Sequence, residues 1–383
     1  MRWLTCLKCD STMKQISLFA PSMRGGGAER VMVALATELS RQGMKVDLVL
    51  AKAEGPYLED VPASVNVVDL NASRIAFALP ALNRYLNSTK PDCLLSTLRH
   101  ANIIAILAKL VSKHRFVLGV REANTIKAHL ENDQSTKERI LPFLMKCFYN
   151  RADVVIAVSN DVKSDLMSCI KMQGDNIVVI NNPVVSDAFY ELSEASTGHP
   201  WLDEKSEPVV LSVGRLTRQK DFASLIRAFS DYRKSHSARL IILGEGEERA
   251  SLEGLVAELG LTDFVSLPGF VSNPFCFMKQ SDVFVLSSLW EGQPNALIQA
   301  LALGVPVIST DCPGGSRDIL KAGKYGTLVP VNSPETLTLA LRDVLATKAD
   351  PVRPRTDTAR TYCRLEFGIQ PVANQYLNAL TGL

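Results

Sequence analysis

A regular alternation of short apolar runs with helical stretches is the feature that most restricts the fold of this chain. Most of these runs are predominantly apolar, without the regular alternation with polar residues that marks a half-exposed strand. Such strands are buried on both faces, as in a parallel sheet covered by helices. The runs stand at 15–20, 45–51, 91–96, 115–120, 153–159 and 174–183, and again at 208–214, 238–244, 263–269, 282–288, 304–310 and 326–331. The sequence therefore predicts an α/β protein with two successive parallel sheets.

The length of the chain and one polar segment divide these runs between two domains. A chain of 383 residues exceeds what a single hydrophobic core usually serves. Ligands of open parallel sheets bind beyond the carboxyl ends of the strands, so two Rossmann-like domains should face each other across a cleft. The expected segments are a disordered N-terminal extension at 1–12, a first domain at 13–183, a polar linker at 184–207, a second domain at 208–363, and a C-terminal helix at 364–383 that crosses back to the first domain.

Positive charge is concentrated in the first half of the chain. Residues 1–183 contain 23 Lys and Arg against 17 Asp and Glu, a net charge of +6, whereas the remaining residues carry a net −4. The first half should therefore face an anionic partner such as a phosphate or a lipid surface, and nucleic acid is not expected. The segment 137–151 is typical of a helix lying on an anionic membrane, and equally of a helix packed on a sheet. Its apolar residues are Ile140, Leu141, Phe143, Leu144 and Phe148.

Neither the apolar runs nor the cysteines indicate an exported or membrane-spanning protein. No run approaches the ~18 to 20 residues of a spanning helix, and the N-terminus lacks the core of a signal peptide. Among eight cysteines only Cys6 and Cys9 have a metal-like spacing, and they lack a second pair or a histidine cluster. Scattered thiols fit a reducing compartment. A cytoplasmic protein, peripheral on the inner face of the membrane, is expected.

A glycine-rich loop, "RGGGAER" at 24–30, follows the first apolar run. Gly26 and Gly27 let backbone approach a ligand closely, and the helix that follows offers free N–H groups to an anion. A dinucleotide-binding fingerprint does not fit, because Arg30 stands where its third glycine should be. The alternative is a tight strand-to-helix turn without a ligand.

A basic loop, "SVGRLTRQKDF" at 212–222, follows the first run of the second series. Gly214 ends the strand, and three cations crowd the turn behind it: Arg215, Arg218 and Lys220. Arginine grips two phosphate oxygens and lysine acts as a point charge, so this loop fits a diphosphate. A solvated basic turn is the alternative.

The stretch "SLWEGQPNALIQALALG" at 288–304 places a carboxylate just ahead of a helix. Pro294 suits the first turn, and the N–H groups of that turn form a second anion site. Glu291 lies outside the helix and is suited to accept hydrogen bonds from neutral hydroxyls, and Gln299 could reach hydroxyls elsewhere on the same ligand. Phosphate with two groups of hydroxyls describes a nucleotide sugar. A solvated loop acid and a helix-surface amide are the alternative.

Taken together, these motifs resemble the family-4 retaining glycosyltransferases of the two-domain B-type fold. The resemblance covers nearly all of 14–345 and is strongest for bacterial enzymes that build surface polysaccharides and lipid-linked glycans. It is carried by "GGGAERV", "NNP" at 181–183, "SVGRL" with Lys220, "LGEGEER", "LPGFV" and "LWEGQPNALIQALALGVPVISTDCPGGSRDIL". It implies that the first domain binds the acceptor and the second binds the nucleotide sugar.

The resemblance also implies roles for individual residues. Arg215 and Lys220 would hold the diphosphate and Glu291 the donor sugar, and these three are the catalytic candidates. Gln299 stands where the family has a second glutamate for the ribose, so that contact should be weaker or rearranged. Other donor-site candidates are Gly26, Gly27, Gly214, Gly269, Phe270, Pro294, Asn295 and Ala296, with Gly269 and Phe270 near the base. Relatives carry a histidine after the strand at 115–120, where this chain has Arg121 and Glu122. Acceptor-side candidates are therefore Glu29, His100, Arg121 and Glu122.

The expected reaction needs no metal or cofactor. No two aspartates lie two positions apart, so the Asp-x-Asp metal clamp of the other major glycosyltransferase architecture is absent from the sequence. The resemblance implies transfer of a hexose or N-acetylhexosamine, with retention, from a UDP-linked donor to a polyprenyl-diphosphate-linked glycan. Alternatives are a nucleotide-sugar epimerase on the same fold, or a binding-only partner with a degenerate donor site.

Overall fold

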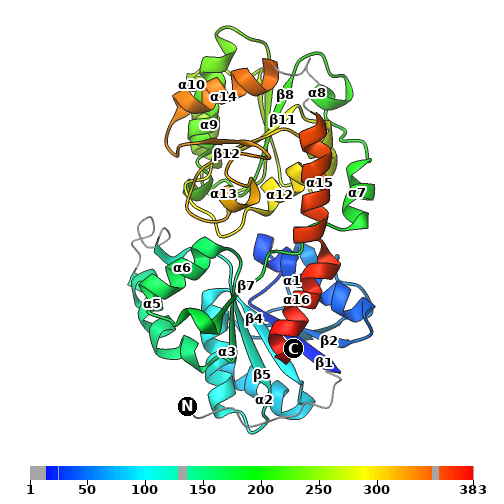
Figure 1. The fold of residues 1–383 in the computed structure, drawn as a ribbon, viewed down its shortest axis with the longest axis vertical. Coiled ribbons are helices and arrows are strands. Elements are labelled where there is room, and N and C mark those ends of the chain that lie inside the picture. Colours follow the sequence, from blue (N-terminus) through cyan, green and yellow to red (C-terminus); the bar gives the residue numbers. More distant parts are fainter. Residues whose placement is uncertain (1–13, 25, 128–135, 347–352, 383) are drawn as a thin grey trace.

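The computed structural model describes residues 14–24, 26–127, 136–346 and 353–382. They form two lobes, each built on one parallel sheet (Figure 1). The two Rossmann-like α/β domains predicted from the apolar runs are thus confirmed. The expected N-terminal extension at 1–12, which contains Cys6 and Cys9, lies outside the described residues.

The first lobe contains a seven-stranded sheet with strand order β3-β2-β1-β4-β5-β6-β7. Its strands are β1 (Gln15–Ala20), β2 (Lys45–Leu50), β3 (Asn66–Asp69), β4 (Cys93–Thr97), β5 (Val117–Glu122), β6 (Val154–Ala157) and β7 (Ile177–Val179). The order reverses between β1 and β4, and ligands of such sheets bind at this switch point. β3 is not among the predicted strands, because this edge strand is largely exposed and has no continuous apolar run.

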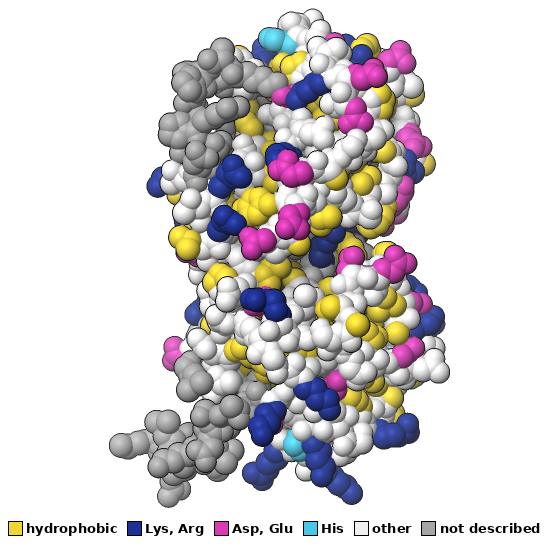
Figure 2. Space-filling view, turned by 90° about the vertical axis from the view of Figure 1, so that its right-hand side faces the viewer, with side chains coloured by type: hydrophobic (Ala, Val, Ile, Leu, Met, Phe, Trp, Pro, Cys, Tyr) yellow, Lys and Arg dark blue, Asp and Glu magenta, His cyan; other side chains and the backbone are white. Residues whose placement is uncertain are grey.

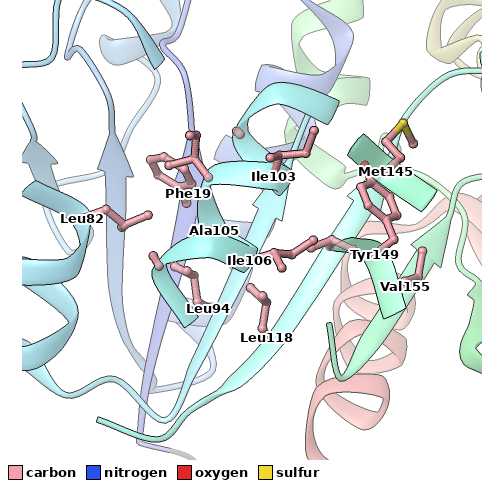
Figure 3. Close-up of a cluster of buried hydrophobic side chains, with 14 of the residues drawn as sticks. Phe19, Leu82, Leu94, Ile103, Ala105, Ile106, Leu118, Met145, Tyr149 and Val155 are labelled. Atoms are coloured by element: carbon pink, nitrogen blue, oxygen red, sulfur yellow. The ribbon is translucent and has the colours of Figure 1, made fainter. Parts of the chain in front are cut away.

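Helices cover both faces of the first sheet, which explains why its strands are apolar on every side. Phe19 of β1 points to one face and Leu18 to the other, as the two-residue period of a strand requires. Figure 3 shows the first face, where Leu94 and Leu118 pack beneath Ile106 of α3. The helices are α1 (Gly27–Arg41), α2 (Leu79–Thr89), α3 (Arg99–Val111), α5 (Thr136–Phe148) and α6 (Asn160–Cys169).

The second lobe repeats this plan with six strands in the order β10-β9-β8-β11-β12-β13. Its strands are β8 (Val209–Val213), β9 (Arg239–Leu243), β10 (Val265–Gly269), β11 (Val283–Leu286), β12 (Val307–Thr310) and β13 (Thr327–Val329). One face is covered by α9 (Phe222–Arg233), α10 (Arg249–Glu258) and α14 (Pro334–Ala346). The other is covered by α11 (Phe275–Gln280), α12 (Asn295–Ala302) and α15 (Arg353–Phe367). The switch point lies between β8 and β11.

The segment expected as a polar linker folds onto the second lobe. It contains two short helices, α7 (Asp187–Ser193) and α8 (Pro200–Asp203). The Phe189 ring packs edge-on against Phe275 of α11, with 4.9 Å between ring centroids. Leu202 of α8 is also buried there. A few apolar residues in a polar stretch are enough to anchor it, which composition alone does not reveal.

The C-terminal region spans both lobes in two helices. α15 packs on the second lobe, and α16 (Ile369–Thr381) packs on the first, beside α1 (Figure 1). The single helix expected at 364–383 is therefore interrupted at Gly368. At this point the chain pairs with the other crossing, because the amides of Val184 and Val185 both donate to the carbonyl of Phe367 at 3.0 Å. The lobes are thus joined by two adjacent segments of chain.

Candidate functional site

Two loops of the second lobe form one unit at its switch point. They are the basic loop at 214–221 after β8 and the acidic loop at 287–294 after β11. The Leu289 amide donates to the carbonyl of Gln219 at 2.8 Å, and the Gln219 side chain donates back to the carbonyl of Trp290 at 2.8 Å. Ser287 Oγ also donates to the carbonyl of Lys220 at 2.8 Å. The basic and acidic loops are therefore held in fixed register.

This register brings together Lys220 and Glu291, which are 71 residues apart in the chain. Lys220 Nζ lies 2.5 Å from Glu291 Oε1, and Ser288 Oγ donates to the same oxygen at 2.6 Å. Glu291 is only 6% exposed, so this ion pair is shielded from water. Among the described residues Glu291 Oε2 has no partner, and it remains available to accept a hydrogen bond from a ligand.

Close backbone contacts fix the position of Glu291. Its amide donates to the carbonyl of Pro313 at 2.8 Å. A Cβ atom at Gly314, where φ is +109°, would lie 2.0 Å from the Glu291 carbonyl oxygen. At Gly292 a Cβ would lie 1.9 Å from the carbonyl oxygen of Ala123, in the first lobe. A glycine is therefore needed after Glu291 because a side chain there would clash with the first lobe. The sequence motif did not indicate this contact.

The helix after Glu291 begins as the sequence predicted. Pro294 precedes α12, and no side chain caps its N-terminus. The amides of Asn295 and Ala296 belong to the first turn, where a helix leaves N–H groups without intrahelical partners. This end of the helix lies at the lobe junction, because the Asn295 side chain donates to the carbonyl of Gly27 at 3.3 Å. This end of α12 can therefore bind an anion.

Gln299 lies one turn further along α12 and is buried, with 6% of its surface exposed. The alternative of a solvated helix-surface amide therefore does not hold for this residue. The C-terminal part of the same helix packs on α15 and on the apolar face of the second lobe.

In the first lobe, the glycine-rich loop is shaped by the protein's own side chains. A Cβ at Gly26 would lie 2.2 Å from Glu29 Oε2, so the Glu29 carboxylate folds back over the start of α1. Gly27 in turn leaves room for the Asn295 side chain. Burial raises the pKa of Glu29, whereas backbone hydrogen bonds and the charges of Arg215 and Arg121 oppose that rise. Glu29 therefore lies within electrostatic reach of the basic loop across the junction.

Arg215 is an exposed residue of the basic loop. The loop at 244–246 packs against the backbone on either side of it, at Gly214 and Leu216. At Gly244, with φ of +140°, a Cβ would lie 1.9 Å from the Gly214 carbonyl oxygen. At Gly246 a Cβ would lie 2.2 Å from the carbonyl oxygen of Leu216. The glycines of "GEGEER" thus allow two backbones to pack, which explains them without a dinucleotide.

The remaining donor-side candidates lie at the end of β10. Gly269 has φ of +94°, and a Cβ there would lie 2.7 Å from Glu245 Oε1. Phe270 follows it with 51% of its surface exposed. An exposed aromatic ring beyond the carboxyl end of a strand is suited to stack on a planar ring.

The four acceptor-side candidates do not form one group of accessible side chains, because two of them are buried. Arg121 and Glu122 are buried, at 1% and 2% exposure. Glu122 pairs with Arg99 at 3.0 Å and accepts from Tyr149 Oη at 3.0 Å. Burial, with the adjacent Glu122 charge, holds the pKa of Tyr149 well above its ordinary value. His100 is exposed on α3. Two of the four therefore lie near donor-side residues. Glu29 is within reach of the Arg215 charge, and Arg121 is connected to Asn295 through Asn182.

Polar residues join the lobes beside this site. Of these only Asn295 was a candidate from the sequence, where it was assigned to the donor site. The Asn182 amide donates to Gln293 Oε1 at 2.5 Å, and its side chain donates to Asn295 Oδ1 at 2.6 Å. Gln293 Nε2 donates to Asn181 Oδ1 at 2.7 Å, and Asp161 accepts from the Gly314 amide at 2.7 Å. The "NNP" turn and the stretch that begins "LWEGQPN" were the available signals. Figure 2 shows the waist between the lobes on one face.

Side chains able to bind a metal do not gather in the part of the chain that the structure describes. No group of three or more His, Cys, Asp or Glu residues there has an arrangement suited to a metal ion. The charged groups at the switch point are instead the basic loop and the Lys220–Glu291 pair.

Two family models match the chain, one for each lobe. The model described as Glycosyltransferase Family 4 matches residues 25–187. The model described as Glycosyl transferases group 1 matches residues 199–360. The second match includes the switch point of the second lobe with its basic and acidic loops, and the first match begins within the glycine-rich loop.

Individual glycosyltransferases are similar to this chain over much of its length. An uncharacterized glycosyltransferase of Methanocaldococcus jannaschii is 35% identical over 246 residues, which cover 62% of this chain and 60% of that protein. The N-acetylgalactosamine-N,N'-diacetylbacillosaminyl-diphospho-undecaprenol 4-alpha-N-acetylgalactosaminyltransferase of Campylobacter jejuni is 27% identical over 344 residues, 87% of this chain and 90% of that protein. The crystal structure of Anabaena HepE in complex with UDP has the same fold, with a TM-score of 0.77 at 20% identity over 97% of this chain and 100% of that one. The chain therefore belongs to the family-4 glycosyltransferases of the two-domain B-type fold.

Proposed function

We propose that the protein transfers a hexose or N-acetylhexosamine, with retention of configuration, from a UDP-linked donor to a lipid-linked glycan in bacterial polysaccharide or glycoconjugate assembly. The observation that carries the proposal is the shielded Lys220–Glu291 pair beside the free start of α12. Support for the donor and acceptor classes comes from the UDP complex of Anabaena HepE and the undecaprenol-linked substrate named for the Campylobacter relative. The intact pair also argues against a binding-only partner with a degenerate site.

In the proposed reaction, charge on the leaving diphosphate is stabilised by fixed groups. Arg215, Lys220 and the first amides of α12 all lie at the switch point of the second lobe. Preorganised donors of this kind lower a barrier by about 3 kcal/mol for each donor group, because they need no reorganisation as charge develops. The bond between the anomeric carbon and the diphosphate oxygen breaks as the acceptor oxygen attacks from the same face. The acceptor proton passes to the departing diphosphate.

Glu291 would orient the donor sugar through its available oxygen, Oε2. A carboxylate that accepts a hydroxyl hydrogen bond fixes the ring and therefore the direction of the anomeric carbon. Contact between the lobes at Gly292 and Asn124 would close the site over the sugar and exclude water, which limits hydrolysis of the donor.

A donor panel tests this function. Because a ligand bound only by the folded state raises the unfolding temperature, we expect uridine diphosphate and one UDP-sugar to stabilise the protein more than other nucleotides do. The stabilising UDP-sugar is then supplied with polyprenyl-diphosphate-linked acceptors, and the anomeric configuration of the product is determined. If no nucleotide sugar stabilises the protein and none is consumed, the proposed function is wrong.

Gln299 allows a prediction about nucleotide binding. Gln299→Glu restores a charged acceptor at the position where the family carries its second acid. Hydrogen bonds to charged groups contribute about 1.5 to 3 kcal/mol, against about 1 kcal/mol for neutral pairs. We expect Gln299→Glu to bind the nucleotide diphosphate severalfold more tightly, as measured by calorimetry. If Gln299→Glu and Gln299→Ala both bind like the parent, Gln299 does not contact the ribose.

Membrane association is also part of the proposal, and it depends on which residues of α5 are exposed. No helix within the described ranges combines the length and apolarity needed to cross a bilayer. In α5, Leu141 and Met145 are buried in the core on one face of the first sheet, where the helix packs beside α3. Ile140 and Phe143 remain 50% and 66% exposed.

We expect α5 to bind anionic membranes through this exposed pair and the neighbouring basic residues. Each basic residue near an anionic surface contributes roughly 1 kcal/mol. The double change Ile140→Ser with Phe143→Ser should reduce sedimentation with anionic liposomes. Leu339→Ser, which replaces a 56% exposed leucine in the second lobe, is the control. Equal sedimentation with anionic and neutral liposomes would rule out electrostatic attachment.

A further inference from the structure

Asn182 occupies an unusual place for a polar side chain. It lies in the turn after β7, at the junction between the lobes, and is 4% exposed. Its amide group is in contact with both lobes. Arg121 Nη2, in the first lobe, donates to Asn182 Oδ1 at 2.5 Å. Asn182 Nδ2 donates to Asn295 Oδ1, in the second lobe, at 2.6 Å.

The buried arginine fixes the orientation of this amide. Arg121 also donates to Thr97 Oγ1 at 2.9 Å and to Tyr376 Oη at 3.0 Å, so its guanidinium is held by β4 and α16. A guanidinium can only donate hydrogen bonds. The atom of Asn182 that faces it must therefore be the oxygen, and the NH₂ group must face Asn295.

The direction of these hydrogen bonds also fixes the orientation of the Asn295 side chain in the proposed donor site. Because Asn295 accepts from Asn182 through Oδ1, its own NH₂ group points to the carbonyl of Gly27, 3.3 Å away. Asn295 is the first residue of α12, and its amide is one of the N–H groups offered to an anion. A chain of hydrogen bonds thus runs from the core of the first lobe, through Asn182, to the anion-binding end of α12.

We propose that Asn182 is a positioning residue that makes assembly of the donor site depend on closure of the lobes. Asn182 does not reach the proposed donor site itself. Its NH₂ group holds Asn295, and with it the first turn of α12, only when the two lobes have the arrangement seen here. The inference rests on the proposed function, since the site that is positioned is the one assigned to the donor diphosphate.

Two substitutions test this NH₂ group. Both remove it, but one strengthens the contact with Arg121 and the other abolishes that contact. Asn182→Asp keeps an acceptor for Arg121, strengthens that contact, and cannot donate to Asn295. A bond in the reverse direction would require the Asn295 amide to invert, which breaks its bond to the carbonyl of Gly27. Asn182→Ala introduces no charge and removes the oxygen that accepts from Arg121. The loss of the hydrogen bond to Asn295 is common to both. The control is Asn160→Ala, which removes another bond between the lobes, from Asn160 Nδ2 to Asp318 Oδ2 at 3.1 Å, without contact to α12.

We expect both Asn182 variants to lower kcat by on the order of 10- to 100-fold, because small displacements of positioned groups are costly. The fraction of donor lost to hydrolysis should rise, since water exclusion is impaired. The dissociation constant for the nucleotide diphosphate should change less than about tenfold, a difference of 1.4 kcal/mol. Asn160→Ala should leave kcat and the hydrolysed fraction near the parent values. Combined with Asn295→Ala, Asn182→Asp should add no further loss, because both changes remove the same contact.

The proposal is overturned if Asn182→Asp, with its unfolding temperature near that of the parent, keeps the parent's kcat and hydrolysed fraction. It is also overturned if Asn160→Ala lowers kcat as much as the Asn182 variants do. A separate readout does not need transfer: the distance between spin labels, one on each lobe, measured with and without uridine diphosphate. The parent should show a single short distance with the nucleotide, and the Asn182 variants a broader or longer one. Identical distances in parent and variants would count against the proposal even if no sugar were transferred, whereas absence of transfer by the parent would refute only the proposed function.

Discussion

Replacing Lys220 with alanine is expected to lower turnover by about 10²- to 10³-fold, the loss typical of removing one preorganised donor. Lys220 supplies a cation next to the start of α12 and is the ion-pair partner of the buried Glu291. Its loss removes charge stabilisation of the leaving diphosphate and leaves a shielded carboxylate with Ser288 as its remaining partner among the described residues. The measurement is kcat with the stabilising UDP-sugar.

Controls separate this effect from general damage and from metal catalysis. Lys234→Ala removes a surface lysine at the other end of α9, where it pairs with Asp231, and should leave turnover unchanged. The unfolding temperature of Lys220→Ala shows whether the variant folds. Transfer by the parent should survive EDTA. If chelation abolishes transfer and magnesium restores it, the role assigned to Arg215 and Lys220 is wrong.

Changing Glu291 to glutamine is the second substitution with a large expected effect. Glutamine keeps the size and one acceptor oxygen but loses the charge, so the hydrogen bond to the sugar and the ion pair with Lys220 both weaken. We expect turnover to fall by on the order of 10²-fold, because the anomeric carbon is no longer held in position. The affinity for the free nucleotide diphosphate, measured by calorimetry, should change little, because that ligand lacks the sugar.

Ser288→Ala provides a graded comparison for Glu291. It removes the hydrogen bond to Oε1 but keeps the carboxylate and its charge. A neutral-to-charged hydrogen bond contributes about 1.5 to 3 kcal/mol, so this variant should lose less turnover than Glu291→Gln. Equal losses in kcat and in diphosphate affinity for Glu291→Gln would mean that Glu291 serves nucleotide binding instead of sugar orientation.

The sequence predicted the fold well where a strand is buried on both faces, as in β1 and β8. It missed β3, whose exposed edge has no continuous apolar run. It also took 184–207 for a linker, because two anchoring residues, Phe189 and Leu202, are outnumbered by polar neighbours. The local sequence pattern identifies a strand that is buried on both faces. It does not identify a segment that is held by only a few apolar contacts.

For the site, residue chemistry predicted which loops carry charge but not how they combine. Lys220 and Glu291 are far apart in sequence, and only the order of β8 and β11 in the sheet makes them neighbours. For the glycine-rich loop, the sequence indicated a close approach but the wrong neighbour. Gly26 was interpreted as space for a ligand, whereas the structure fills that space with the Glu29 carboxylate. A glycine in a sequence indicates close approach but does not say what approaches.

The return of the chain to the first lobe has a consequence for protein engineering. α16 buries Val372, Tyr376 and Leu380 in the core of the first lobe, although it follows the whole second lobe in the sequence. A hybrid enzyme made to exchange donor specificity between relatives therefore requires two junctions, one near Val185 and one near Gly368. Residues 369–381 have to come from the same parent as the first lobe, because a helix from the other parent would not fit the surface that it completes.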